Sequence, residues 1–489
     1  MVGILSIATF LRLYRINVLT EFLGDQGRTM LVMYDWVRRG IVPLSGPTTL
    51  TGQPLGPFFY YLLLPGYLLS QGPVGVAVWV ALLGVASVAV LYIAVRRMFG
   101  VVPARAVSLL WAVSPLIVGA DRDIWEPNLV PLFATLFVYL LYRAHREWSL
   151  LVWGMTGVIL GILMQLHYPN VIFVGMTGLY FLVSPFLYRR KLIEVLKAGG
   201  CVFAGFLITL LPFLWYESSV GFRDITGIAS VFVQSGATHV GKRVMVMNVS
   251  DYAFRVFSVF LPYMSERITA FLIAAWMVFV AARRSKKNIF ITVWLLGGLT
   301  GMAAYPGVVH NHYLYFLVPV PFFMTASVLS SLKRKTIQFV GVIVLLICCI
   351  LQAAKTDIFI PGPHDVDRVS AAVEQIILRA NDVPFSLTLV NSLSFSDLHY
   401  QYYFHISGHE PAAVTSTAYP LLFLVCDSTS CPQTGDLTSQ KSLPVICYDA
   451  HCSEFYPTLN LAKDWRFVEE EPLLKNGIPL GHLYEFRRM

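Results

Sequence analysis

Five short basic clusters punctuate the chain, and each of them borders a long apolar stretch. Loops rich in lysine and arginine are retained on the cytoplasmic face of a membrane. The spacing of the clusters therefore predicts a chain that crosses a membrane many times and returns each time to the same, inner face. The segments between the clusters then reach the outer face. The clusters lie at residues 96–97, 143–146, 189–191, 283–287 and 333–335.

The composition supports this interpretation. Of the 489 residues, 56% are hydrophobic and 13% are charged, whereas a soluble domain carries about 25% charged residues. The formal net charge of +8 would also suit a nucleic-acid partner. The basic residues, however, sit at the ends of apolar stretches, as retained inner loops do. We therefore expect membrane lipid, and no nucleic acid, as a partner of this chain.

The apolar stretches are long enough to serve as transmembrane helices, which need about 20 residues. Together with a short N-terminal segment, residues 1–16, they predict an α-helical polytopic membrane protein with about eleven transmembrane helices and a cytoplasmic N-terminus. Arg12 and Arg15 lie at the outer end of the first segment, against the charge rule, but the five clusters agree with one another. The other runs are residues 74–92, 101–120, 129–142, 150–166, 171–187, 198–215, 268–282, 290–304, 313–329 and 337–353.

Several outer segments contain apolar residues but are too short or too polar to span. Residues 25–39 and 55–69 are interpreted as helices lying in the membrane interface on the outer face. Residues 217–250 have the composition of a polar loop, and residues 251–263 again resemble an interfacial helix. These segments place additional structure on the outer side of the membrane.

The chain changes character after residue 354. Residues 365–379 carry apolar side chains at helical spacing. Three short runs bounded by turn residues are typical of strands, at residues 386–390, 421–426 and 443–448. We therefore predict a transmembrane domain over residues 1–354 and a small extracytoplasmic α/β domain over residues 355–489.

The chain has seven cysteines. Three of them, Cys201, Cys348 and Cys349, lie within spans, where cysteine is usually a small buried apolar residue. The other four fall in the predicted outer domain, where disulfides persist. Local pairing predicts two disulfides, although the same spacing also suits a four-cysteine zinc site. The four are Cys426, Cys431, Cys447 and Cys452.

Asp25 is the first chemically notable residue of the outer segments. It precedes a predicted helix, so its carboxylate is either a helix N-cap or a general base held at the membrane surface. A second outer turn carries four charges in six residues, namely Asp121, Arg122, Asp123 and Glu126. Such a cluster is either a solvated loop or a compact turn packed against the membrane interface, and the interleaved Trp125 and Pro127 favour the compact turn.

Histidines mark two further outer turns. His167 begins a His-Tyr-Pro-Asn sequence, and His310, His312 and Tyr313 lie close together ahead of another span. Imidazole and hydroxyl groups at one helix end can hold a phosphate or a metal. The His-x-His pair alone does not define a zinc site, which needs three or four ligands.

Taken in order, these pieces resemble the GT-C glycosyltransferases, and most of all the bacterial protein-mannosyltransferase and aminoarabinose-transferase type. The resemblance covers roughly residues 4–330. Members of this group are multispanning enzymes that use sugars carried on polyprenyl phosphate. The matching positions are residues 10–14, 25–27, 46–48, 52 and 55–61, Arg122 with Trp125 and Pro127, His167 with Tyr168, His312 with Tyr313, and Pro319.

The resemblance implies that a sugar is transferred to an acceptor hydroxyl on the outer face, with inversion. The transferred group would be a hexose or a pentose, and the acceptor a glycan, a lipid or a protein. Asp25 would be the base. Arg122 would bind the departing phosphate through its planar fork, with His312 and Tyr313 as further donors and His167 as an additional candidate. The scheme requires no cofactor and no metal ligand, and leaves a divalent metal open.

One position departs from the family pattern. The family often carries a second acid beside the first aspartate, and Gln26 stands there in this chain. The second acid would then come from elsewhere in the outer segments. The candidates are Glu21, Asp121, Asp123 and Glu126.

Two other functions fit a similar topology. One is an outer-face ligase or polymerase of lipid-linked glycans, which would use a lipid diphosphate. The other is a transporter or sensor with an outer ligand domain, which would show charged residues in mid-membrane or broken, paired repeats. Charges occur only near the ends of the predicted spans, which favours the transferase.

Overall fold

The computed structural model describes residues 1–49, 52–227, 242–261, 264–305, 307–414, 416, 419–428, 430–446, 458–475 and 477–489. Residue contacts divide the chain into two compact units, each assembled from segments that are distant in sequence. Unit 1 comprises Met1–Tyr14, Pro43–Leu63 and Trp79–Phe359, and unit 2 comprises Arg15–Val42, Leu64–Val78 and Ile360–Met489. The domain boundary predicted at residues 354 and 355 remains a prediction.

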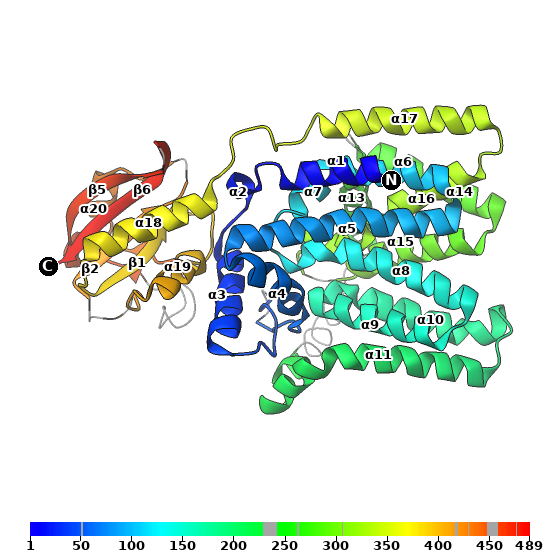
Figure 1. Cartoon of the computed structure of the whole chain (residues 1–489), viewed down its shortest axis with the longest axis horizontal. Helices are drawn as coiled ribbons and strands as arrows, with labels where there is room; N and C mark the ends of the chain where they lie inside the picture. Colours follow the sequence, from blue (N-terminus) through cyan, green and yellow to red (C-terminus); the bar gives the residue numbers. More distant parts are fainter. Residues whose placement is uncertain are drawn as a thin grey trace. The chain divides into compact units, whose positions relative to one another are not determined.

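Unit 1 is built from helices whose long axes lie side by side (Figure 1). Two helices, α4 (Phe58–Ser70) and α5 (Pro73–Phe99), contribute residues to both units. The other helices of unit 1 are α1 (Val2–Leu13), α6 (Val101–Val113), α7 (Pro115–Ala120), η1 (Glu126–Leu129), α8 (Val130–Glu147), α9 (Leu150–Leu166), η2 (Tyr168–Asn170), α10 (Val171–Leu187), α11 (Leu192–Ser219), α13 (Lys242–Phe260), α14 (Glu266–Arg283), α15 (Lys286–Ala303), η3 (Asn311–Leu317), α16 (Pro319–Ser331) and α17 (Lys335–Ala353).

Within the described part of the chain, 6 helical segments are long and apolar enough to cross a membrane. Shorter apolar helices accompany them, at Val2–Leu13, Phe58–Ser70, Val101–Val113 and Leu150–Leu166. The protein is therefore a polytopic α-helical membrane protein, as predicted, while the number of about eleven spans remains a prediction. The 6 segments are Pro73–Phe99, Glu126–Glu147, Tyr168–Leu187, Leu192–Ser219, Asn311–Ser331 and Lys335–Ala353.

Two sequence predictions in unit 1 differ from the structure. Residues 101–120 form two helices rather than one, because Ser114 takes an extended conformation and Pro115 opens α7. Proline disfavours a helical residue before it and suits the first turn of a new helix. The predicted loop over residues 217–250 is also wrong at its end, since α13 begins at Lys242.

Unit 2 combines a sheet with helices from both ends of the chain. The four-stranded sheet has the order β1-β2-β6-β5, in which β1 and β2 are parallel and the other neighbours are antiparallel. Its strands are β1 (Phe385–Val390), β2 (Leu421–Cys426), β5 (Trp465–Lys475) and β6 (Ile478–Arg488). A separate two-stranded sheet joins β3 (Leu443–Pro444) to β4 (Thr458–Leu459). The predicted small α/β domain is thus confirmed.

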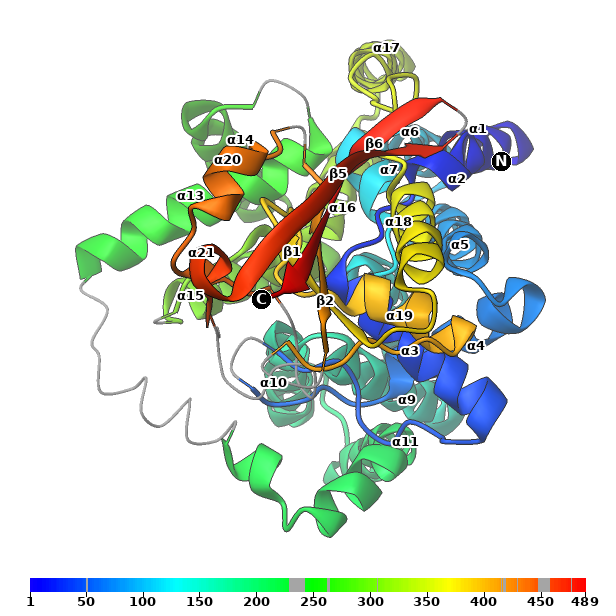
Figure 2. The ribbon, with the colours of Figure 1, turned by 90° about the vertical axis from the view of Figure 1, so that its left-hand side faces the viewer.

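Helices cover this sheet and connect it to the N-terminal part of the unit. Helix α18 (Asp365–Ala380) contacts β2, β5 and β6 and runs beside the sheet in Figure 2. Helix α19 (Leu398–Ser407) packs against both α18 and α3 (Gly24–Arg39). The sheet thus contacts α18, α18 contacts α19, and α19 contacts α3. The remaining helices are α2 (Ile16–Leu19), α20 (Thr434–Thr438) and α21 (Leu461–Asp464).

Candidate active site

Asp25 lies in the first turn of α3, within unit 2. The helix begins at Gly24 and its N-cap is Leu23, so the interpretation of Asp25 as an N-cap is wrong. The backbone N–H of Leu23 is bound instead by Gln26 Oε1, at 3.0 Å. The Asp25 carboxylate forms an ion pair with Arg28, one helical turn further on, and remains 24% exposed. Asp25 is therefore a partly exposed carboxylate fixed on a helix, while Gln26 performs the capping.

The surroundings of Asp25 strengthen its affinity for a proton. Burial raises the pKa of Asp25, and the positive charge of Arg28 partly opposes this rise. Burial also raises the pKa of Glu21, and the charges of Asp365 and Asp25 raise it further. A carboxylate with a raised pKa is a stronger base than an ordinary one and suits proton abstraction near neutral pH.

The turn at residues 120–128, in unit 1, is compact, and several of its charged side chains are buried. Asp121, Arg122 and Glu126 are all less than one tenth exposed. Asp123 accepts a hydrogen bond from Asn128 Nδ2 at 3.1 Å, and its carbonyl accepts one from Trp125 N at 2.9 Å. The interpretation as a solvated loop is therefore wrong.

Two adjacent residues of this turn, Asp121 and Arg122, contact α1 and the residue that follows it. Arg12 Nε and Nη2 each lie 2.8 Å from Asp121 Oδ2, so this carboxylate is engaged in a buried ion pair. The next residue, Arg122, donates through Nη2 to the carbonyl of Tyr14 at 3.3 Å. The pairing of Asp121 with Arg12 makes Asp121 a structural anchor rather than a suitable second acid.

Three of the predicted phosphate ligands come together elsewhere in unit 1. The ring of His167 lies 5.3 Å from that of His312 and 5.0 Å from that of Tyr313, and the Trp125 ring lies 4.5 Å from that of His312 in a tilted arrangement. His310 lies parallel to His312 at 5.6 Å. The end of α9, the turn before η1 and η3 thus meet in an aromatic cluster of imidazole, phenol and indole rings.

The charge state of this cluster follows from its burial. Burial lowers the pKa of His167 to about 3, and the neighbouring His312 contributes to the shift. His167 is therefore neutral near pH 7 and can donate one hydrogen bond and accept another. Among the described residues, no group of three or more His, Cys, Asp or Glu side chains is arranged to hold a metal ion.

A cavity of about 380 Å³ lies between α7, η1, α8, α13 and η3, all in unit 1. Its walls are mainly apolar, with polar groups contributed by Asp121, Asn128, Arg255 and Asn311. Arg255 was not predicted as a site residue, because the sequence indicated only an interfacial helix over residues 251–263. Its Nη1 donates to Val309 O at 2.8 Å, and its Nη2 pairs with Asp251 at 2.5 Å.

The predicted site residues thus fall into two sets. Asp25 and Glu21 belong to unit 2, and Arg122, His167, His312 and Tyr313 belong to unit 1. Unit 2 also contains a disulfide between Cys426 and Cys431. Cys447 and Cys452 lie outside the described residues, so their pairing remains a prediction.

Comparison with known proteins gives the fold a context. Residues 53–216 match the family model described as dolichyl-phosphate-mannose-protein mannosyltransferase. No curated protein sequence matches the chain. ArnT from Cupriavidus metallidurans bound to undecaprenyl phosphate has a TM-score of 0.62 at 12% identity, covering 99% of this chain and 97% of that one.

Two more solved structures extend this similarity. ArnT from Cupriavidus metallidurans in the apo state has a TM-score of 0.60 at 14% identity, over 91% of this chain and 95% of that one. The Archaeoglobus fulgidus oligosaccharyltransferase in complex with zinc and sulfate has a TM-score of 0.54 at 12% identity, over 87% of this chain and 67% of that one.

The chain is therefore a polytopic membrane protein with the GT-C fold, and the resemblance predicted from its sequence is confirmed. Within this fold it is similar to ArnT over nearly its whole length. At these identities the similarity establishes the fold and not the reaction.

Proposed function

We propose that the protein is a membrane glycosyltransferase that moves a sugar from a polyprenyl-phosphate donor to an acceptor hydroxyl on the outer face. The cavity in unit 1 carries this proposal. Its apolar walls suit a polyprenyl-linked substrate, and Arg255 supplies a positive charge for a phosphate. The structural neighbours support this choice, since ArnT was solved with undecaprenyl phosphate and the Archaeoglobus oligosaccharyltransferase with a dolichol-phosphate.

The reaction is a displacement at the anomeric carbon. The acceptor oxygen forms a bond to that carbon and gives its proton to a base, while the bond from the carbon to the phosphate oxygen breaks. The electron pair of the broken bond remains on the lipid phosphate. Attack from the side opposite the phosphate inverts the configuration. We assign the role of base to Asp25, whose raised pKa and partial exposure suit proton abstraction.

The departing phosphate needs hydrogen-bond donors and positive charge. We assign Arg122 to this phosphate, because a guanidinium can donate two parallel hydrogen bonds to two oxygens of one phosphate. Arg255 lines the cavity, and His312, Tyr313 and His167 form the aromatic cluster in the same unit. We assign hydrogen-bond donation to these three rings. Among the candidate second acids we favour Glu21, because the charge of Asp25 is one of the causes that raise the pKa of Glu21.

The proposal includes an orientation in the membrane. We place the N-terminus and the five basic clusters on the cytoplasmic side, and the tail after Ala353 outside. The transferred sugar is a hexose or a pentose, and the acceptor is a glycan, a lipid or a protein. A ligase of lipid-linked glycans is the second candidate, because the similar oligosaccharyltransferase shares the fold.

The test is a transfer assay with the purified protein in lipid nanodiscs and radiolabelled polyprenyl-phosphate sugars. We expect release of polyprenyl monophosphate together with a glycosylated acceptor. A ligase would instead consume a glycan linked to a lipid diphosphate, transfer the glycan, and release the lipid diphosphate. If neither class of donor is consumed when candidate sugars and acceptors are supplied, the protein is not a transferase.

Variants of the two arginines test the site itself. Arg122→Lys keeps the charge but loses the two-pronged contact, so the donor KM should rise roughly ten- to a hundredfold. Arg255→Gln should lower kcat/KM for the donor by a similar factor. Arg267→Gln, at an exposed position in α14, is the matched control and should leave both constants unchanged. Unchanged constants in all three folded variants would remove both arginines from the phosphate site.

A further inference from the structure

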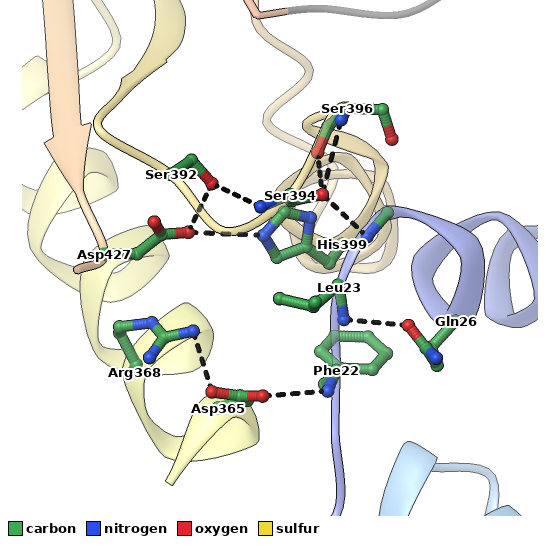
Figure 3. A network of polar contacts seen from close by, with 11 residues as sticks. Phe22, Leu23, Gln26, Asp365, Arg368, Ser392, Ser394, Ser396, His399 and Asp427 are labelled. Atoms are coloured by element: carbon green, nitrogen blue, oxygen red, sulfur yellow. Dashed lines mark hydrogen bonds and ion pairs between the residues drawn. The ribbon is translucent and has the colours of Figure 1, made fainter. Parts of the chain in front are cut away.

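A buried polar network surrounds the first turn of α3, and all of it lies within unit 2 (Figure 3). The backbone N–H of Gly24 donates to Ser394 Oγ at 3.0 Å. The N–H of Phe22 donates to Asp365 Oδ2 at 3.3 Å. Asp365 pairs in turn with Arg368, at 2.8 Å. Side chains from the C-terminal part of the chain therefore hold the backbone on both sides of the α3 start.

The same turn is in backbone contact with α19. A Cβ atom at Gly27 would lie 2.2 Å from the backbone nitrogen of His399 and 2.3 Å from its Cα. A Cβ atom at Gly24 would lie 2.0 Å from Ser396 Oγ. At Gly27 the obstacle is backbone, so no side-chain rotation can relieve it. The two glycines that flank Asp25 and Gln26 therefore permit an approach that no other residue allows.

His399 and Asp427 complete the network behind this contact. His399 Nε2 lies 3.9 Å from Asp427 Oδ2, and both side chains are 0% exposed. Ser392 Oγ donates to Asp427 Oδ2 at 2.9 Å and accepts a hydrogen bond from Ser394 N at 2.9 Å. Figure 3 shows the contacts that run from Asp427 through Ser392 to Ser394, and the separate bond between Leu23 and Gln26. A fully buried carboxylate and imidazole are costly in a protein interior unless polar groups lie beside them.

The loop that carries Asp427 is itself closed covalently. Asp427 directly follows Cys426, the last residue of β2, and Cys426 is joined to Cys431. The sheet, the disulfide loop, α19 and α3 thus form one continuous structure. The proposed transfer chemistry uses none of Gly27, Ser394, His399 and Asp427 directly.

We infer that Gly27, Ser394, His399 and Asp427 are positioning residues, which fix the first turn of α3 and thereby aim the Asp25 carboxylate. This inference rests on the proposed role of Asp25. The bonds of Gly24 N to Ser394 and of Phe22 N to Asp365, together with the close backbone approach at Gly27, restrict the position of this turn. A general base must lie within hydrogen-bond reach of its proton, and displacement by about 1 Å can lower a rate roughly a hundredfold. The C-terminal domain therefore acts on the reaction through α3.

Gly27→Ala is the decisive variant, because it adds one methyl group against the backbone of α19. Alanine favours a helix interior more than glycine does, so helix propensity alone would strengthen α3. We expect instead that hydrogen exchange of residues 22–30 speeds up, that kcat falls about ten- to a hundredfold, and that the donor KM is unchanged. Gly435→Ala, where a Cβ would meet nothing within 4 Å, is the matched control and should change none of these.

The results for Gly27→Ala either support or contradict the positioning role of this contact. Unchanged exchange in Gly27→Ala would show that α19 does not hold the turn. Faster exchange with an unchanged kcat would show that the contact is structural only. If the wild-type protein shows no transferase activity, the proposed function fails, while the exchange measurement still reports on the contact.

A milder variant covers the case in which Gly27→Ala does not fold. Ser394→Ala removes the hydroxyl that accepts from Gly24 N and should lower kcat with an unchanged donor KM. Ser407→Ala, at the other end of α19, is the control. It removes a hydroxyl that donates to the carbonyl of Phe404, one turn earlier in the same helix. A kcat for Ser394→Ala equal to that of Ser407→Ala would overturn the positioning role of the serine.

Discussion

At the residue scale, Arg12 and Asp121 form a buried ion pair that ties α1 to the end of α7. Arg12 also donates through Nη1 to Ala112 O at 3.0 Å, and its side chain is 0% exposed. In the proposed orientation, this pair accounts for the position of Arg12 against the charge rule. Its charge is neutralised inside unit 1, so it does not act as a loop charge that selects the cytoplasmic face.

Removing one partner of this pair should destabilise the protein. Arg12→Met leaves Asp121 buried without its counter-charge, which costs about 3–5 kcal/mol. The double variant Arg12→Met/Asp121→Leu removes both charges and should recover most of that loss. Thermal unfolding in detergent measures both proteins. Equal losses in the single and the double variant would contradict the buried-pair interpretation.

Asp25→Asn should abolish transfer while donor binding persists. Asparagine keeps the shape of the side chain but cannot accept the proton, and a positioned general base contributes roughly 10²- to 10⁴-fold in rate. The measurements are kcat for transfer and the donor dissociation constant. Since Leu23, and not Asp25, is the N-cap of α3, loss of capping does not explain a loss of rate. Wild-type turnover in the asparagine variant would reject the role of base.

Arg28 should set the lower pH limit of the reaction. Its charge lowers the pKa of Asp25 against the rise caused by burial. In Arg28→Gln the pKa of Asp25 is therefore higher, the base is protonated at a higher pH, and the acidic limb of the kcat profile moves upward. Arg38→Gln, near the other end of α3, is the control. If the acidic limb moves to lower pH in Arg28→Gln, or moves equally in Arg28→Gln and Arg38→Gln, Arg28 does not set the pH limit.

At the scale of elements, the long apolar helices could be predicted well because their signal is local. The predicted runs at residues 150–166 and 171–187 coincide with α9 and α10. Strands β5 and β6 were missed because β5 is mostly exposed and carries Glu469, Glu470 and Glu471 in a row. Strand β5 forms because it pairs with β6, and this pairing is not indicated by the sequence of β5 itself.

The disulfide loop after β2 should stabilise unit 2. A short loop of this kind contributes no more than about 3 kcal/mol by restricting the unfolded chain. The double variant Cys426→Ser/Cys431→Ser should therefore unfold at lower temperature and should show faster hydrogen exchange at residues 427–431. The exchange of α17 is the internal control. Unchanged stability in the double variant would show that the disulfide adds nothing to the fold.

At the scale of the whole molecule, each unit is assembled from distant segments, and this limits prediction of the site. Residue types at Asp25, Arg122 and His167 indicate chemistry from the sequence alone. Arg255 and His399 do not, because an arginine in an amphipathic stretch and a lone histidine in a helix are ordinary. Their contacts with Val309 and Asp427, which lie 54 and 28 positions away along the chain, distinguish them only in the folded structure.

The predicted orientation is a property of the whole chain. Cysteines introduced at Lys286 and Asn460, in a protein whose Cys201, Cys348 and Cys349 are replaced by serine, should react with impermeant reagents from opposite faces. Lys286 belongs to a basic cluster and should be labelled only from the inside. Labelling of both positions from one face would refute the eleven-span topology.

The bond between Phe22 and Asp365 also has a consequence for how the protein is made. Its two residues are 343 positions apart, so at about 5–20 residues per second the ribosome needs roughly 17 to 70 s to deliver the second after the first. During that interval the start of α3 has none of its partners from α18, α19 or the sheet. Strand β6, which pairs with β2, arrives later still. A newly made chain therefore acquires a fixed Asp25 only after α18, α19 and the strands of the sheet have been synthesised.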